Sequence, residues 1–215
     1  MFHQSKNKLH PKVHKEILTK EQVELLPLLA KFSKDFGLVG GTAVALHLGH
    51  RRSIDFDLFS SKKFGNQSLI NRILKFRQFD KIIVNKLDEL TLEMAGVKLT
   101  FFNYPFNIEY NQSFEKIIRM PDLLTLSAMK AFALGMRAKW KDYVDLYFII
   151  KDHLSITEIS QKGDLIFREK FDEKIFRSQL SYFESIDHSE VLEFLPGFEI
   201  SEELVKKELT EFSIS

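Results

Sequence analysis

The 215-residue sequence contains no cysteine, which excludes disulfides, thiolate metal sites and cysteine nucleophiles. It has no excess of charge of either sign, because 31 basic residues stand against 30 acidic ones. A global basic field is therefore absent, and any contact with nucleic acid must come from local patches. No apolar run approaches the roughly 20 residues needed to cross a bilayer. The first residues also lack the apolar segment of a signal peptide. These absences predict a cytoplasmic protein that has no membrane contact.

The remaining composition is that of an ordinary globular protein, with 44% hydrophobic and 28% charged residues. The length suits one larger domain or two small ones. Phenylalanine is abundant, with 21 residues against a single tryptophan, and we interpret it as core material. The Phe-rich stretches around Phe101, Phe102 and Phe183 are accordingly expected in the core and not as platforms for base stacking.

Hydrophobic periodicity predicts an α/β amino-terminal half after a polar, basic and loosely held arm over residues 1–18. A helix is expected to begin at Thr42, directly after the turn over residues 37–41, with Thr42 as its N-cap. The expected strand over 54–59 alternates polar and apolar residues, with Ile54 on its buried face. The other elements expected are a helix over 19–36, a short strand and turn over 37–41, a helix over 66–76, and strands over 81–86, 89–94 and 97–103.

Helical patterning dominates after about residue 111. Pro121 suits the first turn of a helix, and Asp122 suits the positive end of its dipole; Gly135 ends or bends this helix. The residues Ser155 to Glu158 form a capping-box pattern. Further helices are expected over 138–150, 172–185 and 201–212. We therefore predict two domains, an α/β core over residues 1–115 and a helical region over 116–215 that completes the active site.

The sharpest motif is an acidic pair, Asp55 and Asp57, within the expected strand. Residues two apart on a strand point to the same face, with their backbones about 7 Å apart. Two carboxylates so placed can converge on a hard cation such as Mg²⁺, or equally Mn²⁺, together with substrate phosphates. Taken alone, an Asp-x-Asp pair also fits an exposed strand face with no ligand.

A phosphate-binding turn precedes this pair. Gly40 and Gly41 allow the backbone to approach a phosphate closely, and the helix start at Thr42 offers free N–H donors. Arg51 and Arg52, just before the acidic strand, fit a triphosphate or an RNA phosphate, although surface salt bridges explain them almost as well. The order of turn, helix and acidic strand suits a nucleoside triphosphate whose metal lies opposite an anion-binding turn.

A second cluster lies in the helical half. Asp142 and Asp145 share one helix face, and Asp145 stands in so apolar a run that it is expected to be partly buried. A buried carboxylate needs a cationic or metal partner, or it takes up a proton. Lys130 lies in a similarly apolar segment. We expect Lys130 and Asp145 to meet at the mouth of the site, where Lys130 contacts phosphate and Asp145 positions it or acts as a base. A purely structural Lys–Asp pair is the alternative.

Five further cations fit a basic flank wide enough to guide an RNA end, although helix-surface charges are the usual explanation for such residues. They are Lys116, Arg119, Arg137, Lys139 and Lys141.

Two sequence blocks closely resemble the AbiEii/AbiGii toxin family, nucleotidyltransferase-like members of the DNA polymerase β superfamily. The first reads Leu38-Val39-Gly40-Gly41-Thr42-Ala43 and, after a short spacer, His47-Leu48-Gly49-His50-Arg51-Arg52-Ser53-Ile54-Asp55-Phe56-Asp57-Leu58-Phe59. The second has Lys130 followed by Arg137-Ala138-Lys139-Trp140-Lys141-Asp142-Tyr143-Val144-Asp145-Leu146-Tyr147. The resemblance spans about residues 38–150.

This resemblance implies an α+β fold, a polymerase-β-like mixed sheet with flanking helices and a helical carboxyl-terminal region. It implies Mg²⁺-dependent nucleotide transfer by a bacterial toxin, with a tRNA 3′ end as acceptor and an antitoxin as partner. Carried over to this sequence, Gly41 and Thr42 bind phosphate and Asp55 and Asp57 bind metal. Lys130 and Asp145 complete the site, with Asp142 as a further member.

One departure from the superfamily leaves other functions open. Many of these enzymes carry a third carboxylate on a later strand, but the matching strand here, residues 97–102, has no acid; Glu93 on the preceding strand could substitute. The alternatives are therefore a degenerate nucleotide-binding module that acts through a protein partner, or a transferase acting on a small molecule such as an antibiotic.

Overall fold

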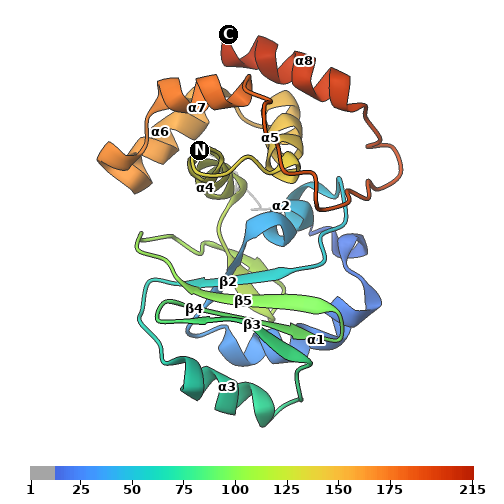
Figure 1. Ribbon diagram of the computed structural model, residues 1–215, viewed down its shortest axis with the longest axis vertical. Coiled ribbons are helices and arrows are strands. Elements are labelled where there is room, and N and C mark those ends of the chain that lie inside the picture. The colour runs from blue at the N-terminus through green and yellow to red at the C-terminus, as the bar shows by residue number, and fades with distance from the viewer. Residues whose placement is uncertain (1–12) are drawn as a thin grey trace, which may run out of the picture.

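A five-stranded mixed sheet organises the amino-terminal half of the computed structural model, which describes residues 13–215 (Figure 1). Strands β2 and β5 run parallel, and the other neighbouring pairs are antiparallel. The spatial order is β1 (Gly37–Val39), β2 (Phe56–Ser60), β5 (Val97–Asn103), β4 (Glu89–Met94) and β3 (Lys81–Lys86).

Alternation along the central strands divides the sheet into two unlike faces. One face is fully apolar and buried, as Leu58, Leu99 and Phe101 show. The ring of Phe101 lies 5.1 Å from that of Phe32, which places helix α1 (Lys20–Phe32) on this face. Helix α3 (Asn66–Leu74) covers the same side (Figure 1). The opposite face carries polar and aromatic side chains and is turned toward the helical half.

The remaining helices lie on the other side of the sheet (Figure 1). Helix α2 (Gly40–Leu48) is almost entirely buried between the sheet and the helices of the carboxyl-terminal half. Those helices are α4 (Leu123–Leu134), α5 (Trp140–Asp152), α6 (Ile156–Phe167), α7 (Glu173–Leu180) and α8 (Glu202–Ser213). Short 3-10 turns occur at Lys15–Ile17 and Arg168–Lys170.

Most elements agree with the sequence prediction. The three strands of the antiparallel ribbon match it to the residue, and Ser155 and Glu158 form the expected capping box at α6. The α+β class, with a mixed sheet and a helical carboxyl-terminal region, is confirmed.

Several local predictions were wrong. The N-cap of α2 is Val39, and Thr42 is already inside the helix, because Gly40 adopts the positive φ that turns the chain into α2. The strand begins at Phe56, so Ile54 and Asp55 precede it, and Ile54 has 56% of its surface exposed. Pro121 lies just before helix α4 and not in its first turn. Asp122 stands at the positive end of the helix dipole, as expected, and its carboxylate accepts a hydrogen bond from the backbone N–H of Thr125.

The amino-terminal arm also differs in part from the prediction. Residues 1–12 of the predicted arm lie outside the described residues. Val13, Ile17 and Leu18 pack against the core, and Ile17 is fully buried, whereas Lys15 and Glu16 are exposed. An unpredicted two-stranded sheet joins β6 (Gln112–Phe114) to β7 (Ile118–Met120). The predicted domain boundary at residue 115 falls in the turn between these two strands. The division into two domains stays a prediction. Within residues 13–215, no helix combines the length and apolarity that crossing a membrane requires.

Candidate active site

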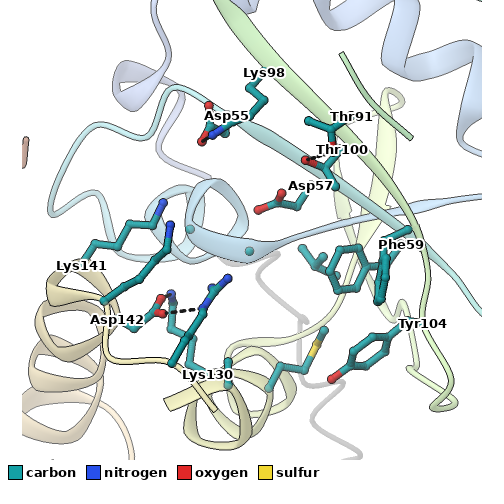
Figure 2. A pocket seen from close by; sticks show the side chains of 18 of the residues that line it. Asp55, Asp57, Phe59, Thr91, Lys98, Thr100, Tyr104, Lys130, Lys141 and Asp142 are labelled. Carbon is teal, nitrogen blue, oxygen red and sulfur yellow. Dashed lines mark hydrogen bonds and ion pairs between the residues drawn. The ribbon is translucent and has the colours of Figure 1, made fainter. Parts of the chain in front are cut away.

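A cavity of about 490 Å³ lies between the polar face of the sheet and the helical half (Figure 2). Its floor is formed by four neighbouring strands, β2, β5, β4 and β3. Its roof comes from α4 and from the start of α5, which contribute Lys130 and Asp142. The cavity therefore joins the two sequence blocks that stand far apart in the chain.

Asp55 and Asp57 line one end of this cavity, as the sequence predicts (Figure 2). Asp57 pairs in the parallel register with Thr100 of β5, and Lys98 approaches Asp55 to 3.2 Å. Burial, and next the negative charge of Asp55, raise the pKa of Asp57 above its usual range. A carboxylate in that position favours a proton or a cation, so the pair is electrostatically prepared for positive charge.

The two glycines are required by their neighbours. Gly40 has φ +72°, and a Cβ there would overlap the carboxylate of Asp57. A Cβ on Gly41 would lie 2.8 Å from Nη2 of Arg51. The Gly-Gly turn thus lets the start of α2, with its free backbone N–H groups, lie directly beside the acidic pair.

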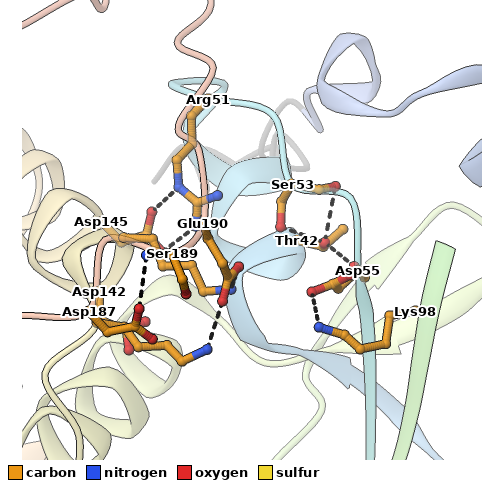
Figure 3. A network of polar contacts seen from close by, with 12 residues as sticks. Thr42, Arg51, Ser53, Asp55, Lys98, Asp142, Asp145, Asp187, Ser189 and Glu190 are labelled. Atoms are coloured by element: carbon orange, nitrogen blue, oxygen red, sulfur yellow. Dashed lines mark hydrogen bonds and ion pairs between the residues drawn. The ribbon is translucent and has the colours of Figure 1, made fainter. Parts of the chain in front are cut away.

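Thr42 faces away from the cavity. Its hydroxyl is 2.9 Å from Oγ of Ser53 and also contacts the backbone carbonyls of Ser53 and Asp55 (Figure 3). The residue is 1% exposed and is not part of the cavity lining. Thr42 therefore fixes the segment that carries Asp55, and the structure does not bring its side chain to a phosphate position.

Lys130 meets both predicted carboxylates. Its Nζ lies 2.6 Å from Oδ1 of Asp142 and 2.7 Å from Oδ2 of Asp145. Burial alone would lower the pKa of Lys130, but the two carboxylates raise it, so the ammonium stays charged. Lys130 and Asp142 line the cavity, whereas Asp145 lies behind them, with no exposed surface.

The buried carboxylate of Asp145 contacts three polar or cationic side chains, those of Arg51, His50 and Lys130. Arg51 donates from Nε and Nη2, and His50 Nε2 lies 2.7 Å from Oδ1 (Figure 3 shows the Arg51 contact). Burial would raise the pKa of Asp145, but Arg51 and Lys130 hold it well below its usual range. Burial lowers the pKa of His50, which favours the neutral ring. The pair of Lys130 and Asp145 is thus present, as part of a larger buried network.

The arginines lie away from the cavity. Arg51 is 2% exposed and forms an ion pair with Asp145. Arg52 pairs with Glu193 at 2.6 Å and donates to the carbonyl of Glu16. Neither residue lines the cavity. The surface salt bridge considered as the alternative describes Arg52, whereas the salt bridge of Arg51 is buried.

Part of the predicted basic flank lines the cavity. Arg137, Lys139 and Lys141 do so, whereas Lys116 and Arg119 line a separate depression near β6 and β7. Lys139 and Lys141 both contact the carboxylate of Glu190. Burial opposes ionisation of Glu190, but hydrogen bonds from the two lysines lower its pKa to about 2.

Glu190 belongs to a crossing segment, residues 186–195, that sequence reasoning missed. The segment is tied at one end to the start of α5, where Asp187 N–H donates to the Ala138 carbonyl at 2.7 Å. At its other end, the N–H of Arg52 donates to the Glu193 carbonyl at 2.8 Å. The segment therefore spans from α5 to the loop after α2 and delivers a carboxylate to the cavity cations.

The end of the cavity away from the acidic pair is apolar and aromatic. The rings of Phe59, Phe102 and Tyr104 lie 5.1 to 6.2 Å from one another and line the wall. Met129 and Met136 face the same space from the roof side. The prediction that Phe102 is a core residue was wrong, because alternation sends Phe101 to the core and Phe102 to the cavity face.

The structure confirms that strand β5 carries no acid beside the pair. It presents Lys98 and Thr100 there, and Glu93 of β4 pairs with Lys81 at 3.2 Å outside the cavity lining. Among residues 13–215, no three histidine or acidic side chains gather as a metal-binding group. Two carboxylates nevertheless match the way Mg²⁺ binds with a nucleotide, where phosphates and water complete its shell. The raised pKa of Asp57 supports this fit.

Comparison with known proteins identifies the family of this chain. Residues 28–209 match the model described as nucleotidyl transferase AbiEii toxin, type IV toxin–antitoxin system. The chain belongs to this family. An uncharacterized protein of Aquifex aeolicus is 31% identical to it over 91% of this chain and 97% of the relative. The AbiEii-family chain is thus a nucleotidyltransferase, and family membership implies a nucleoside triphosphate substrate, a divalent metal and an antitoxin partner.

Solved structures confirm the fold of this AbiEii-family chain. JHP933 from Helicobacter pylori is 16% identical, with a TM-score of 0.56 and 92% coverage of both chains. MenT4, a nucleotidyltransferase toxin of Mycobacterium tuberculosis, is 11% identical with a TM-score of 0.54, covering 89% of this chain and 82% of its own.

Proposed function

We propose that this protein transfers a nucleotidyl group from a nucleoside triphosphate to a hydroxyl at a tRNA 3′ end, as the toxin of a toxin–antitoxin pair. The observation that carries the proposal is the cavity itself, in which Asp55 and Asp57 face the cations of the helical half. In the reaction the acceptor hydroxyl releases its proton to solvent, its oxygen bonds to the α-phosphorus, the bond from that phosphorus to the bridging oxygen breaks, and pyrophosphate leaves.

Asp55 and Asp57 would hold Mg²⁺, which when bound neutralises phosphate charge and polarises the reacting phosphoryl group. The start of α2 offers backbone N–H groups to phosphate oxygens at Gly40 and Gly41. Lys130 lines the cavity and has three N–H donors, so one can meet a phosphate while Asp142 and Asp145 hold the others. Developing charge on the leaving pyrophosphate is thereby stabilised.

Asp145 is best described as a positioning residue in this proposal. It is fully buried behind Lys130, and Arg51 and His50 occupy its oxygens. It cannot reach an acceptor hydroxyl from there without leaving Arg51. We therefore assign Asp145 the task of orienting Lys130, and not that of a base.

The acceptor would approach over the basic residues at the cavity mouth. Arg137 is half exposed, and Lys139 and Lys141 lie beside it. Such a cluster attracts a phosphate backbone, and its effect weakens with salt. A terminal hydroxyl is the part of a tRNA that can enter a cavity of this size.

The test is incubation of the purified protein with Mg²⁺, each α-labelled nucleoside triphosphate in turn, and total tRNA. The Asp55→Ala/Asp57→Ala variant serves as the control. Label that enters tRNA with wild type alone supports the proposal and names the nucleotide. Label in a low-molecular-weight acceptor would instead show a small-molecule transferase. Nucleotide binding without transfer to any acceptor would show a binding module that acts through its partner.

A further inference from the structure

Among the acids that line the cavity, Glu89 shares only with Asp57 the absence of an ion pair to a described residue. It is a half-buried residue at the start of β4 and lines the cavity wall. Its carboxylate accepts a hydrogen bond from the Thr91 hydroxyl at 3.1 Å. Asp55, Asp142 and Glu190 each pair with cations, but Glu89 forms no ion pair with any residue of the described chain.

The sheet register locates Glu89 relative to the acidic pair. Asp57 of β2 pairs with Thr100 of β5, which pairs with Thr91 of β4. Two residues further along, Phe59 of β2 pairs with Phe102 of β5, which pairs with Glu89 of β4. Neighbouring strands are about 4.8 Å apart, so β4 lies about 10 Å from β2. Glu89 is therefore too far from Asp57 to share a metal ion with it, but it lies in the row of the aromatic wall.

The charge distribution orients a nucleotide along this floor. The cations and the start of α2 stand at the acidic end, which suits phosphates. The opposite end, with Phe59, Phe102 and Tyr104, suits a flat apolar ring, because aromatic faces stack on bases. A base packed there presents its polar edge to the wall that contains Glu89.

An ionised carboxylate only accepts hydrogen bonds, so it distinguishes the edges of the bases. Cytosine and adenine present an exocyclic amino group, and guanine presents one beside a ring N–H. Uracil presents carbonyl oxygens on both sides of its single N–H. Lone pairs of those oxygens would face the negative charge of Glu89, which disfavours uracil.

We propose that the aromatic end of the cavity is the nucleobase subsite and that Glu89 selects bases carrying an exocyclic amino group over bases that lack it. This proposal rests on the proposed function, because it needs a nucleotide with its phosphates at Asp55 and Asp57. Glu89 acts in it as a specificity residue and takes no part in the chemical step.

The test is calorimetric binding of Mg²⁺-nucleotides to the full chain without acceptor, using pairs that differ in one amino group. The pairs are CTP with UTP, ATP with ITP, and GTP with ITP. We expect the amino-bearing member of at least one pair to bind about tenfold or more tightly, as a charged hydrogen bond implies. Glu89→Gln should bring that ratio close to one, because an amide offers both a donor and an acceptor.

Glu93→Gln is the matched control, since Glu93 lies on the same strand and the same face but pairs with Lys81 outside the cavity. It should leave every ratio unchanged. Equal binding within all three pairs of wild type would overturn the proposal while leaving nucleotidyl transfer intact. A ratio that survives Glu89→Gln would overturn it as well. Binding of no nucleotide at all would overturn both this proposal and the proposed function.

Discussion

Arg51 holds Asp145 through two parallel hydrogen bonds, from Nε to Oδ1 at 2.7 Å and from Nη2 to Oδ2 at 2.9 Å. Both side chains are buried, and Lys130 reaches the same carboxylate from the cavity side. The contact links the loop after α2 to α5, so one buried anion joins the two halves of the site. Removal of the Asp145 carboxylate should first lower the stability of the fold.

We expect Asp145→Asn to lower the free energy of unfolding by about 3–5 kcal/mol, because it leaves the Arg51 charge buried without a counterion. Urea unfolding followed by circular dichroism measures this change. The control is Glu193→Gln, which breaks the exposed pair with Arg52 and should cost less than about 1 kcal/mol. Unchanged stability with lost turnover would instead make Asp145 a reacting group.

The ionised carboxylate of Asp57 should lower the stability of the fold, whereas that of Asp145 raises it. Burial and the charge of Asp55 raise the pKa of Asp57 in the folded state above the ordinary value of 3.8. The folded protein therefore binds this proton more tightly than the unfolded chain. The free energy of unfolding should fall as pH rises from about 3.8 through the raised pKa, and stay lowered above it.

Asp57→Asn removes that penalty, so its melting temperature at neutral pH without metal should equal or exceed that of wild type. Its turnover should fall by about a hundredfold or more, because a metal ligand is lost. Scanning calorimetry and the tRNA-labelling assay measure the two quantities. A variant that melts well below wild type in metal-free buffer would contradict this account of Asp57.

Gly40 and Gly96 form a natural pair for separating backbone strain from crowding. Both have positive φ, +72° and +74°, but only at Gly40 would a Cβ overlap Asp57, and nothing lies within 4 Å of a Cβ on Gly96. Each change to alanine should cost about 1–2 kcal/mol of stability for the left-handed backbone. Only Gly40→Ala should also abolish transfer. Equal activity of the two variants would show that the position of Asp57 does not depend on Gly40.

Glu190 competes with a nucleotide for Lys139 and Lys141 if these lysines bind phosphates. Glu190→Gln should then tighten Mg²⁺-nucleotide binding several-fold, because the carboxylate no longer pairs with the two lysines. Titration calorimetry measures the affinity, and Glu193→Gln, on the same crossing segment, should leave it unchanged. Weaker binding in Glu190→Gln would mean that the carboxylate helps to hold the ligand.

Local patterns in the sequence sufficed for much of the fold. The ribbon from β3 to β5 follows from alternation and from the turn at Ala95 and Gly96. Asp55 and Asp57 could be placed on one face from their spacing, and Lys130 could be paired with Asp145 because each charge stands in an apolar run. The resemblance in residues 38–59 then indicated the family.

The other contacts of the site could not be predicted, because they join segments that are distant in the sequence. Arg51 and Asp145 are 94 positions apart, and nothing in the sequence near Arg51 distinguishes a core guanidinium from a phosphate ligand. Thr42 resembles a helix cap locally, but packing turns its hydroxyl to Ser53. Glu190 lies in a segment with no regular period, so its approach to Lys139 and Lys141 becomes visible only in three dimensions.

The buried contacts of Asp145 also restrict how the protein can open. A hinge motion that separated the sheet from α4 and α5 would pull Arg51 and His50 away from a carboxylate without solvent, at a cost of several kcal/mol. The ties of residues 186–195 are backbone hydrogen bonds and ion pairs near the surface. The two halves should therefore move together as one rigid body. Exchange of nucleotide and pyrophosphate should then depend on detachment of the crossing segment, residues 186–195.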